Sequence, residues 1–296
     1  ALALREVLPP RPPAGPTTGG AERCDWAGFL GLVAPQGVLE EIRAKQGGAD
    51  FLDAFLADPA WMADFLCSGD PLTDWPAALR ALDVMCWLCP EVYDSPVLRR
   101  WAAAAALNAG ADPTEAALLL RETLALRKEG FHLRGADGLR CEQMRYTMIP
   151  AQCDAANARW LATQHNVPPR QYGGVCWAAP YRLNNFFGDS IHGSDYYKPW
   201  EHAYLRHEAS RKVGAVCGGL SYYGSAAAKT HGLPSTTGGQ PAHCAYLVWA
   251  PGQGRWTICY NVSPYTGSHF APLANIWKYS YHELFADAFA RGGMRE

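Results

Sequence analysis

The chain has no apolar run long enough to cross a membrane as a helix. Its longest candidate, WAAAAALNAG from Trp101, falls well short of the roughly 18 apolar residues that a span requires. The segment ALALREVLPPRPPAGPTTGG also lacks the basic stretch and following apolar stretch of a secretory signal. We therefore expect no membrane insertion, and we interpret residues 1–22 as a tether rich in proline and glycine.

Charge is also scarce and balanced. Charged residues make up 18% of the chain and the net charge is −2, with no long run of either sign. A surface that binds nucleic acid needs clustered basic side chains, so we expect no nucleic-acid partner. The 296 residues, 49% of them hydrophobic, are enough for a sizeable core in one large domain or two smaller ones.

Ten cysteines are too few for a disulfide scaffold, where roughly 8–10% cysteine is typical. They are more than a cytosolic enzyme of this size usually has, which favours an extracytoplasmic location but leaves the compartment open. The CxxC motif of Cys86 and Cys89 has no second pair at zinc-ribbon spacing, so core packing or a local disulfide is favoured. His202 and His207 lie five residues apart and do not share one helix face; we expect no metal and no other cofactor.

Apolar residues recur at intervals of three and four through residues 23–166, which predicts a helical domain. The clearest segments are VLEEIRAKQ, ADFLDAFLADPAWMADFLC, WPAALRALDVMCWLC, AALLLRETLALRKEG and AQCDAANARWLATQ. Asp112-Pro113-Thr114-Glu115 is typical of a helix start. Pro168-Pro169 marks the predicted boundary, and residues 167–296 form a second, α+β domain in which AHCAYLVWA and RWTICYNVS predict a β-hairpin. The predicted fold class is α+β.

Cys217 stands between glycines in VGAVCGGLSYYGSAAAKTHGLP, at the start of a predicted helix that ends at Gly232. The N-terminus of a helix favours the thiolate form of a cysteine, and its amide groups can stabilise an oxyanion. His243 begins the first strand of the hairpin and Asn261 lies on the second, so the two side chains can be neighbours. Cysteine, histidine and asparagine are then interpreted as nucleophile, base and orienting acceptor.

These residues resemble the transglutaminase-like superfamily of papain-fold cysteine enzymes over about residues 170–265. The matching positions are Gly214 and Cys217, Gly232-Leu233-Pro234, His243, and Trp256 followed by Asn261. Gly214 stands three residues before the cysteine, where the family usually has Gly-x-Cys, and Asn261 stands where most members have aspartate. The resemblance implies a central helix that carries the cysteine and packs on an antiparallel sheet. It also implies cleavage or transfer of an amide bond through a thioester, on a peptide, protein or glycopeptide substrate.

The segment YRLNNFFGDSIHGSDYYKPWEH, residues 181–202, concentrates polar and aromatic side chains. We interpret it either as a wall of the substrate cleft or as a loop that only covers the helix of Cys217. The residues predicted to contact substrate are Asn184, Asn185, His192, Tyr196, Tyr197, Trp200, Gly218 and Gln240. His192 is an alternative to His243 as the base.

Several other interpretations stay open. Cys217 fits the description of a small core residue at a tight turn, and Cys244 is expected in the core because strand neighbours point to opposite faces. Asn261 begins the glycosylation sequon Asn-Val-Ser, and a glycosylated side chain would not orient a histidine. A transglutaminase-like fold without activity would be a binding module. The aromatic content also suits a hydrolase of carbohydrate polymers that does not use Cys217.

Overall fold

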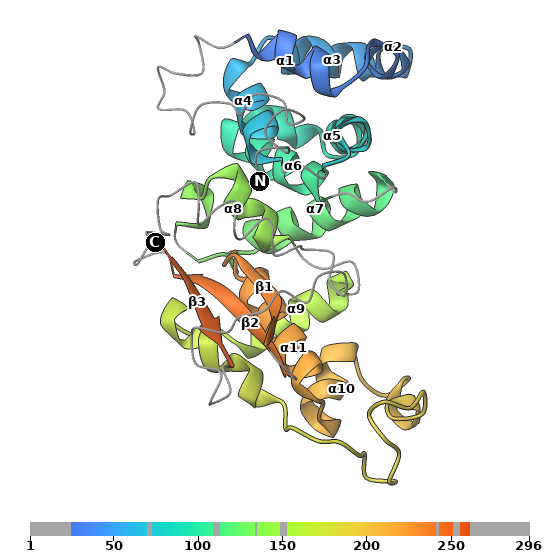
Figure 1. Cartoon of the computed structure of the whole chain (residues 1–296), viewed down its shortest axis with the longest axis vertical. Coiled ribbons are helices and arrows are strands. Elements are labelled where there is room, and N and C mark those ends of the chain that lie inside the picture. The colour runs from blue at the N-terminus through green and yellow to red at the C-terminus, as the bar shows by residue number, and fades with distance from the viewer. Residues whose placement is uncertain are drawn as a thin grey trace, which may run out of the picture. The chain divides into compact units, whose positions relative to one another are not determined.

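The computed structural model describes residues 25–69, 73–108, 113–133, 135–148, 153–240, 243–250 and 255–260 (Figure 1). This part of the chain is mostly helical and contains a three-stranded antiparallel sheet, which confirms the α+β class. The α-helices are α1 (Trp26–Val33), α2 (Gln36–Arg43), α3 (Gly48–Leu56), α4 (Pro59–Ser68), α5 (Trp75–Leu88), α6 (Pro96–Leu107), α7 (Pro113–Lys128), α8 (Cys141–Met144), α9 (Ala155–Gln164), α10 (Arg206–Val213) and α11 (Cys217–Thr230). The 3-10 helices are η2 (Pro90–Asp94), η3 (Ala136–Gly138), η4 (Arg145–Thr147), η5 (Pro169–Ala178) and η6 (Lys198–Trp200), and the strands are β1 (Ser235–Gln240), β2 (His243–Ala250) and β3 (Arg255–Cys259).

The chain divides into two compact units. The first comprises residues 1–121, 137–148 and 286–296, and the second comprises residues 122–136 and 149–285. The domain boundary predicted between residues 166 and 167 lies inside the second unit, because α9 packs on α11 there. The predicted tether, residues 1–22, lies outside the described residues.

Proline and a capping side chain set where several helices begin. The Asp58 carboxylate accepts two amide hydrogen bonds from the first turn of α4, both at 3.0 Å, and Pro59 occupies the first helical position. The run ADFLDAFLADPAWMADFLC therefore forms two helices, α3 and α4. α7 begins at Pro113 as predicted, although Asp112 lies outside the described residues.

An aromatic cluster forms much of the core of the first unit. The Phe55 ring stacks on Phe51 at 5.7 Å between centroids, and it meets Trp61 and Phe65 edge-on at 5.2 and 5.7 Å. The alanine run 102–106 of α6 is buried and lets α4, α5 and α8 approach closely. The described part of the first unit is therefore held together by contacts between helices.

The two cysteines of the CxxC motif are core residues. Cys86 and Cys89 are 2% and 1% exposed, and neither is in a disulfide. Burial raises the pKa of both thiols. Core packing is thus confirmed for this pair, and the alternative of a local disulfide is wrong.

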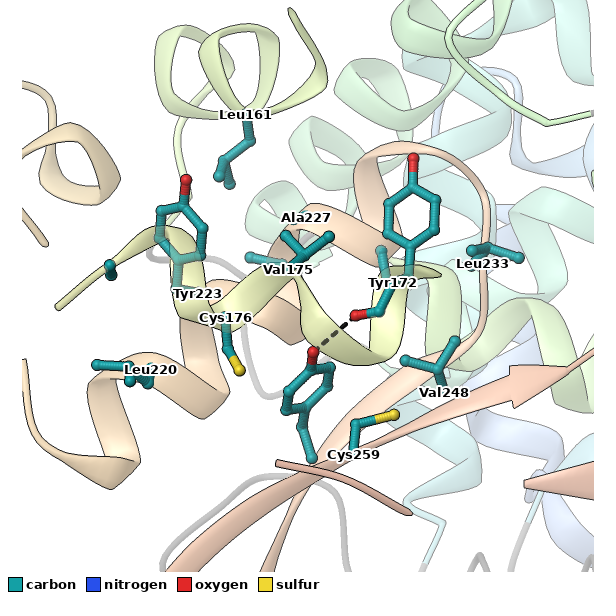
Figure 2. Packing of buried hydrophobic residues seen from close by; sticks show 14 of the residues in the cluster. Leu161, Tyr172, Val175, Cys176, Leu220, Tyr223, Ala227, Leu233, Val248 and Cys259 are labelled. Carbon is teal, nitrogen blue, oxygen red and sulfur yellow. Dashed lines mark hydrogen bonds between the residues drawn. The ribbon is translucent and has the colours of Figure 1, made fainter. Parts of the chain in front are cut away.

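α11 is the central helix of the second unit. α9 and η5 pack against it, and so do β1 and β2 of the sheet, whose strand order is β1-β2-β3. Figure 2 shows the shared core, with Tyr172, Val175 and Cys176 from η5, Leu220, Tyr223 and Ala227 from α11, and Val248 and Cys259 from the sheet. Within this core the hydroxyl group of Tyr246, on β2, donates to the carbonyl oxygen of Tyr172, on η5, at 2.6 Å (Figure 2).

The predicted hairpin is confirmed by the pairing of β2 with β3. The strands are antiparallel, with Tyr246 opposite Cys259 and Trp249 opposite Trp256. β1, which the sequence did not predict, pairs with the other edge of β2, from Ser235 opposite Val248 to Gln240 opposite His243. β2 is therefore the middle strand, and its first residue is His243.

A glycine lets α11 lie close to β2. A Cβ atom built on Gly224 would stand 2.6 Å from the Tyr246 ring, which is shorter than real contacts allow. Tyr246 is itself held in place by the hydrogen bond to Tyr172. The distance between the helix and the strand thus depends on the absence of a side chain at Gly224.

We expect Gly224→Ala to lower the free energy of unfolding by about 1–3 kcal/mol, because the helix must move away from β2 or Tyr246 must rotate. Gly218→Ala is the matched control on the same helix, since a Cβ there meets nothing within 4 Å. Urea denaturation of both variants measures the difference. Equal stability of the two variants would contradict the close contact.

Buried histidines of the second unit, among them His165 and His207, are held neutral. His207 is 1% exposed and its Nδ1 lies 3.3 Å from the Asn157 Oδ1, while the Nε2 of His165 lies 2.6 Å from the Tyr223 hydroxyl. Burial is the main cause that lowers the pKa of each ring to about 4, and nearby arginines add to it. Each ring therefore binds a proton more weakly in the folded chain than in the unfolded one.

This difference predicts a loss of stability in acid. The folded-state pKa lies below the ordinary value of 6.5, so the loss begins as the pH falls below about 6.5 and continues to about 4. Between pH 7 and pH 5 each histidine is expected to remove about 2 kcal/mol from the free energy of unfolding. In urea denaturation, His207→Gln should lose about 2 kcal/mol less of its free energy of unfolding between pH 7 and pH 5 than the wild type does.

His192→Gln at an exposed site is the control for that experiment, because it leaves both buried rings in place. If the wild-type chain were equally stable at pH 7 and pH 5, the two buried rings would not be neutral in the folded state.

Candidate active site around Cys217

Cys217 is the first residue of α11, as the sequence predicts. The preceding residue, Val216, provides no side-chain hydrogen bond to cap the helix. The first amide groups of a helix have no partner within it, so those of Cys217 and Gly218 are suited to bind negative charge. Space beside Gly218 is open, and the Cys217 side chain is half-buried against the core of the second unit.

A tight turn at Gly214 connects the end of α10 to Cys217 at the start of α11. Gly214 has φ of 99°, and a Cβ there would lie 2.8 Å from the Pro180 carbonyl oxygen. The next residue, Ala215, donates to that oxygen at 3.0 Å and accepts from the Arg182 amide at 3.0 Å. The glycine matched to the family pattern is thus required by this turn, at its position three residues before the cysteine.

His243 is oriented by a main-chain carbonyl group. Its Nε2 lies 2.8 Å from the carbonyl oxygen of Tyr260, and the two rings meet at 4.8 Å between centroids. A carbonyl oxygen only accepts, so Nε2 carries the proton and Nδ1 of the neutral ring is an acceptor. No described residue hydrogen-bonds to Nδ1. His243 therefore presents an unprotonated nitrogen, as a general base requires.

The backbone at Tyr260 is unusual. Its φ of 55° is the positive value of a left-handed residue, and Tyr260 directly follows β3. The conformation turns the chain out of the strand and aims the carbonyl group at His243. A non-glycine residue in this region costs of the order of 1–3 kcal/mol and is frequent at functional sites. Asn261, the predicted orienting residue, is the next residue and lies outside the described residues.

The packing of α11 on β2 places the start of the helix and the start of the strand at the same end of their contact. The Ser221 hydroxyl donates to the Cys244 carbonyl oxygen at 2.7 Å, and Gly224 faces Tyr246, so the helix and strand advance in the same direction. Cys217 lies one turn before Ser221, about 6 Å back along the helix, and His243 directly precedes Cys244 on the strand. Cys217 and His243 therefore lie on the same side of this contact, each at the first residue of its element.

Electrostatic effects agree with this placement. A charge on Cys217 raises the pKa of both Cys244 and Tyr260, although burial is the main cause in each case. Cys217 and His243 thus share Tyr260 as a neighbour. No hydrogen bond joins their side chains in the described part of the structure, a looser geometry that is common before substrate binds.

Other thiols in this unit are inert by comparison. Burial raises the pKa of Cys176 and Cys244 to about 11, and that of Cys153 and Cys259 to about 12. Cys244 is 6% exposed, which confirms that it is a core residue. At neutral pH these four side chains stay protonated and poorly reactive.

The loop that follows η5 is organised by Asn185. Its Oδ1 accepts from the amides of Phe187 and Asp189, both at 2.9 Å, and its Nδ2 donates to the Tyr196 carbonyl oxygen at 2.9 Å. Because Asn185 is 6% exposed and makes these bonds, the structure gives it a supporting position in the loop.

Two tyrosines of the same loop hold the turn before Cys217. Tyr196 is 1% exposed and its hydroxyl donates to the Val213 carbonyl oxygen at 3.4 Å. The Tyr197 hydroxyl donates to the Gly214 carbonyl oxygen at 2.8 Å. Both were predicted to contact substrate, and in the structure both hydroxyl groups instead bind the backbone of the turn that precedes Cys217.

The other predicted contacts lie at different places. Asn184 and His192 are exposed, and no described contact joins the His192 ring to Cys217. Trp200 packs on Phe187 at 5.6 Å between centroids. Gln240 pairs with His243 through its backbone, and its side chain lies outside what the structure describes.

Two exposed aromatic side chains flank the site: Trp177, which the sequence analysis did not single out, and Tyr181, the first residue of the segment interpreted as a possible cleft wall. Trp177 is 62% exposed and its ring meets Tyr260 edge-on at 4.8 Å. Tyr181 is 51% exposed and forms a parallel β-bridge with Ala215, two residues before Cys217. They give the site an apolar wall. Their positions depend on η5 and on the Gly214 turn, which no local pattern indicates.

Comparison with protein-family models, with curated proteins and with solved structures finds no match to this chain. Among the described residues there is no group of three or more potential metal ligands, the EHAYLRHE segment included. In the same residues no helix combines the length and the apolar character that a bilayer crossing needs. The case for a function therefore depends on the geometry around Cys217.

Tyr197→Phe tests how that geometry is held. Loss of the bond to Gly214 should lower the free energy of unfolding by about 1 kcal/mol and slow the reaction of Cys217 with iodoacetamide. Tyr204→Phe is the control, because the Tyr204 hydroxyl makes no hydrogen bond among the described residues. Unchanged stability and labelling in Tyr197→Phe would show that the bond does not position the nucleophile.

Proposed function

We propose that the protein is a cysteine-dependent hydrolase or acyltransferase that acts on amide or peptide bonds. The observation that carries the proposal is the tautomer of His243. Its Nε2 is engaged by the Tyr260 carbonyl group, which leaves Nδ1 of the neutral ring as an acceptor, and Tyr260 is a neighbour of both His243 and Cys217. A thiol at an uncapped helix N-terminus beside such a ring is the arrangement that nucleophilic catalysis needs.

The proposed reaction has two stages. His243 Nδ1 takes the thiol proton, and the Cys217 sulfur forms a bond to the carbonyl carbon of the substrate. The amide groups of Cys217 and Gly218 stabilise the oxyanion. The bond from carbon to nitrogen then breaks, the leaving amine receives the proton from His243, and a thioester remains on Cys217. Water, or a second amine, attacks the thioester and restores the thiol.

The resemblance to transglutaminase-like enzymes supports the same assignment. A helix that begins with the cysteine and packs on an antiparallel sheet is what that family implies, and α11 and β1-β2-β3 have this arrangement. Gly232, with φ of 69°, ends the helix region immediately before Leu233 and Pro234. The papain-like domain itself and the orienting role of Asn261 are parts of the proposal.

The exposed rings of Trp177 and Tyr181 favour substrates with an apolar or aromatic group near the reacting amide. Peptides, proteins and glycopeptides all provide such groups. Hydrolysis is the simpler outcome, because the described site contains no feature that selects an amine over water.

Alkylation of Cys217 tests the proposal directly. With iodoacetamide at about pH 6, Cys217 is expected to react at least about tenfold faster than Cys153, Cys176, Cys244 and Cys259, which burial keeps protonated. His243→Ala should slow the labelling of Cys217 about tenfold or more, since the thiolate loses its partner. Peptide mass spectrometry reads each cysteine separately.

His165→Gln is the control for the histidine exchange, because this ring is buried against Tyr223 and not beside Cys217. Slow labelling of Cys217 in the wild type, at the rate of the buried thiols, would favour a binding module without catalysis. Full activity of Cys217→Ser on a carbohydrate polymer would favour the glycan hydrolase.

A further inference from the structure

The first unit contains a hollow of about 420 Å³ between α3, α5 and η2. This volume is within the range of small-molecule sites, roughly 300–1,000 Å³. Three aromatic side chains line it, Phe51 from α3, Trp87 from α5 and Tyr93 from η2, together with Cys86. Two carboxylates, Asp50 and Asp83, also line it.

Asp83 is the feature that needs an explanation. It is 6% exposed, and it makes no hydrogen bond and no ion pair with any described residue. Burial is the main cause that raises the pKa of its carboxyl group. A carboxylate in a largely buried residue without a protein partner is disfavoured, so natural proteins usually pair or hydrogen-bond such a group.

The nearest cation does not pair with Asp83. Lys45 acts on it electrostatically, but its Nζ is 2.9 Å from the Glu41 carboxylate, which also binds Arg80 at 2.8 Å. Asp83, Cys86 and Trp87 stand three and four residues apart on α5, so one face of that helix presents all three to the hollow. The carboxylate is therefore left facing the hollow and its aromatic walls.

We propose that the hollow binds a primary ammonium group on a short apolar stem, as at the end of a lysine side chain, with Asp83 as its counter-ion. Aromatic rings attract cations at their faces, and Phe51, Trp87 and Tyr93 supply rings at this hollow for the ammonium group and for its apolar stem. A metal ion fits less well, because Ca²⁺ takes about 6–8 oxygen ligands and the hollow is mainly apolar. The inference does not depend on the chemistry of Cys217.

The access route supports this occupant. Trp87 is 62% exposed and lies over Gly47, whose Cβ position is 3.5 Å from the ring, so the indole forms a rim that a ligand can reach from solvent. Asp50 is exposed at the same site and adds negative charge at the entrance. An ammonium group would thus pass a carboxylate at the surface and meet a second one inside.

Titration calorimetry of the full chain with n-butylammonium chloride tests the site. We expect saturable binding with Kd on the order of 1 mM, and binding of neutral 1-butanol at least about tenfold weaker. Asp83→Asn should weaken ammonium binding about tenfold or more, and Trp87→Ala by a few-fold.

Two matched variants complete the experiment. Asp53→Asn removes a carboxylate from α3 that pairs with Arg43 and does not line the hollow, and Leu88→Ala truncates the neighbour of Trp87 on α5. Both should bind like the wild type. The proposal is overturned if the wild type shows no saturable binding up to about 10 mM. It is also overturned if Asp83→Asn binds equally well, or if 1-butanol binds as tightly as the cation.

Discussion

The contact between α11 and β2 is the constraint on which the second unit depends. Gly224 has no side chain, so the helix lies against the Tyr246 ring, and the Ser221 hydroxyl ties the same helix to the Cys244 carbonyl oxygen. These two contacts fix how far the helix can slide along the strand. The positions of the helix N-terminus and of the first residue of β2 follow from them, and those two positions carry Cys217 and His243.

Histidines in this unit show how burial separates structural from chemical roles. His165 and His207 lie in the core, where the cost of desolvating a charge keeps them neutral. His243 stands at the start of the middle strand and is half-buried, with one nitrogen bound to a carbonyl oxygen and the other available. The same residue type thus serves as packing in one place and as a candidate base in another.

Local signals in the sequence predicted the parts of the structure that local interactions determine. Apolar spacing located the helices, and the glycines around Cys217 located the start of α11. β1 was not predicted because STTGGQ has no alternation of apolar and polar residues. It forms a strand because β2 offers an edge with which it can pair. The Tyr260 carbonyl group and the isolated carboxylate of Asp83 were missed for a related reason. A main-chain acceptor carries no residue signature, and the surroundings of an aspartate depend on distant helices.

Most cysteines in the described part of the chain are buried core side chains, and those named next are not cross-linked. The residues found outside any disulfide include Cys86, Cys89, Cys141, Cys153, Cys176, Cys217, Cys244 and Cys259. Packing among these residues therefore does not depend on oxidation, and a thiol reductant would leave it intact. A nucleophilic Cys217, by contrast, is lost when its sulfur is oxidised. The surroundings that preserve the proposed chemistry are thus reducing ones, and such surroundings remove no disulfide among these eight residues.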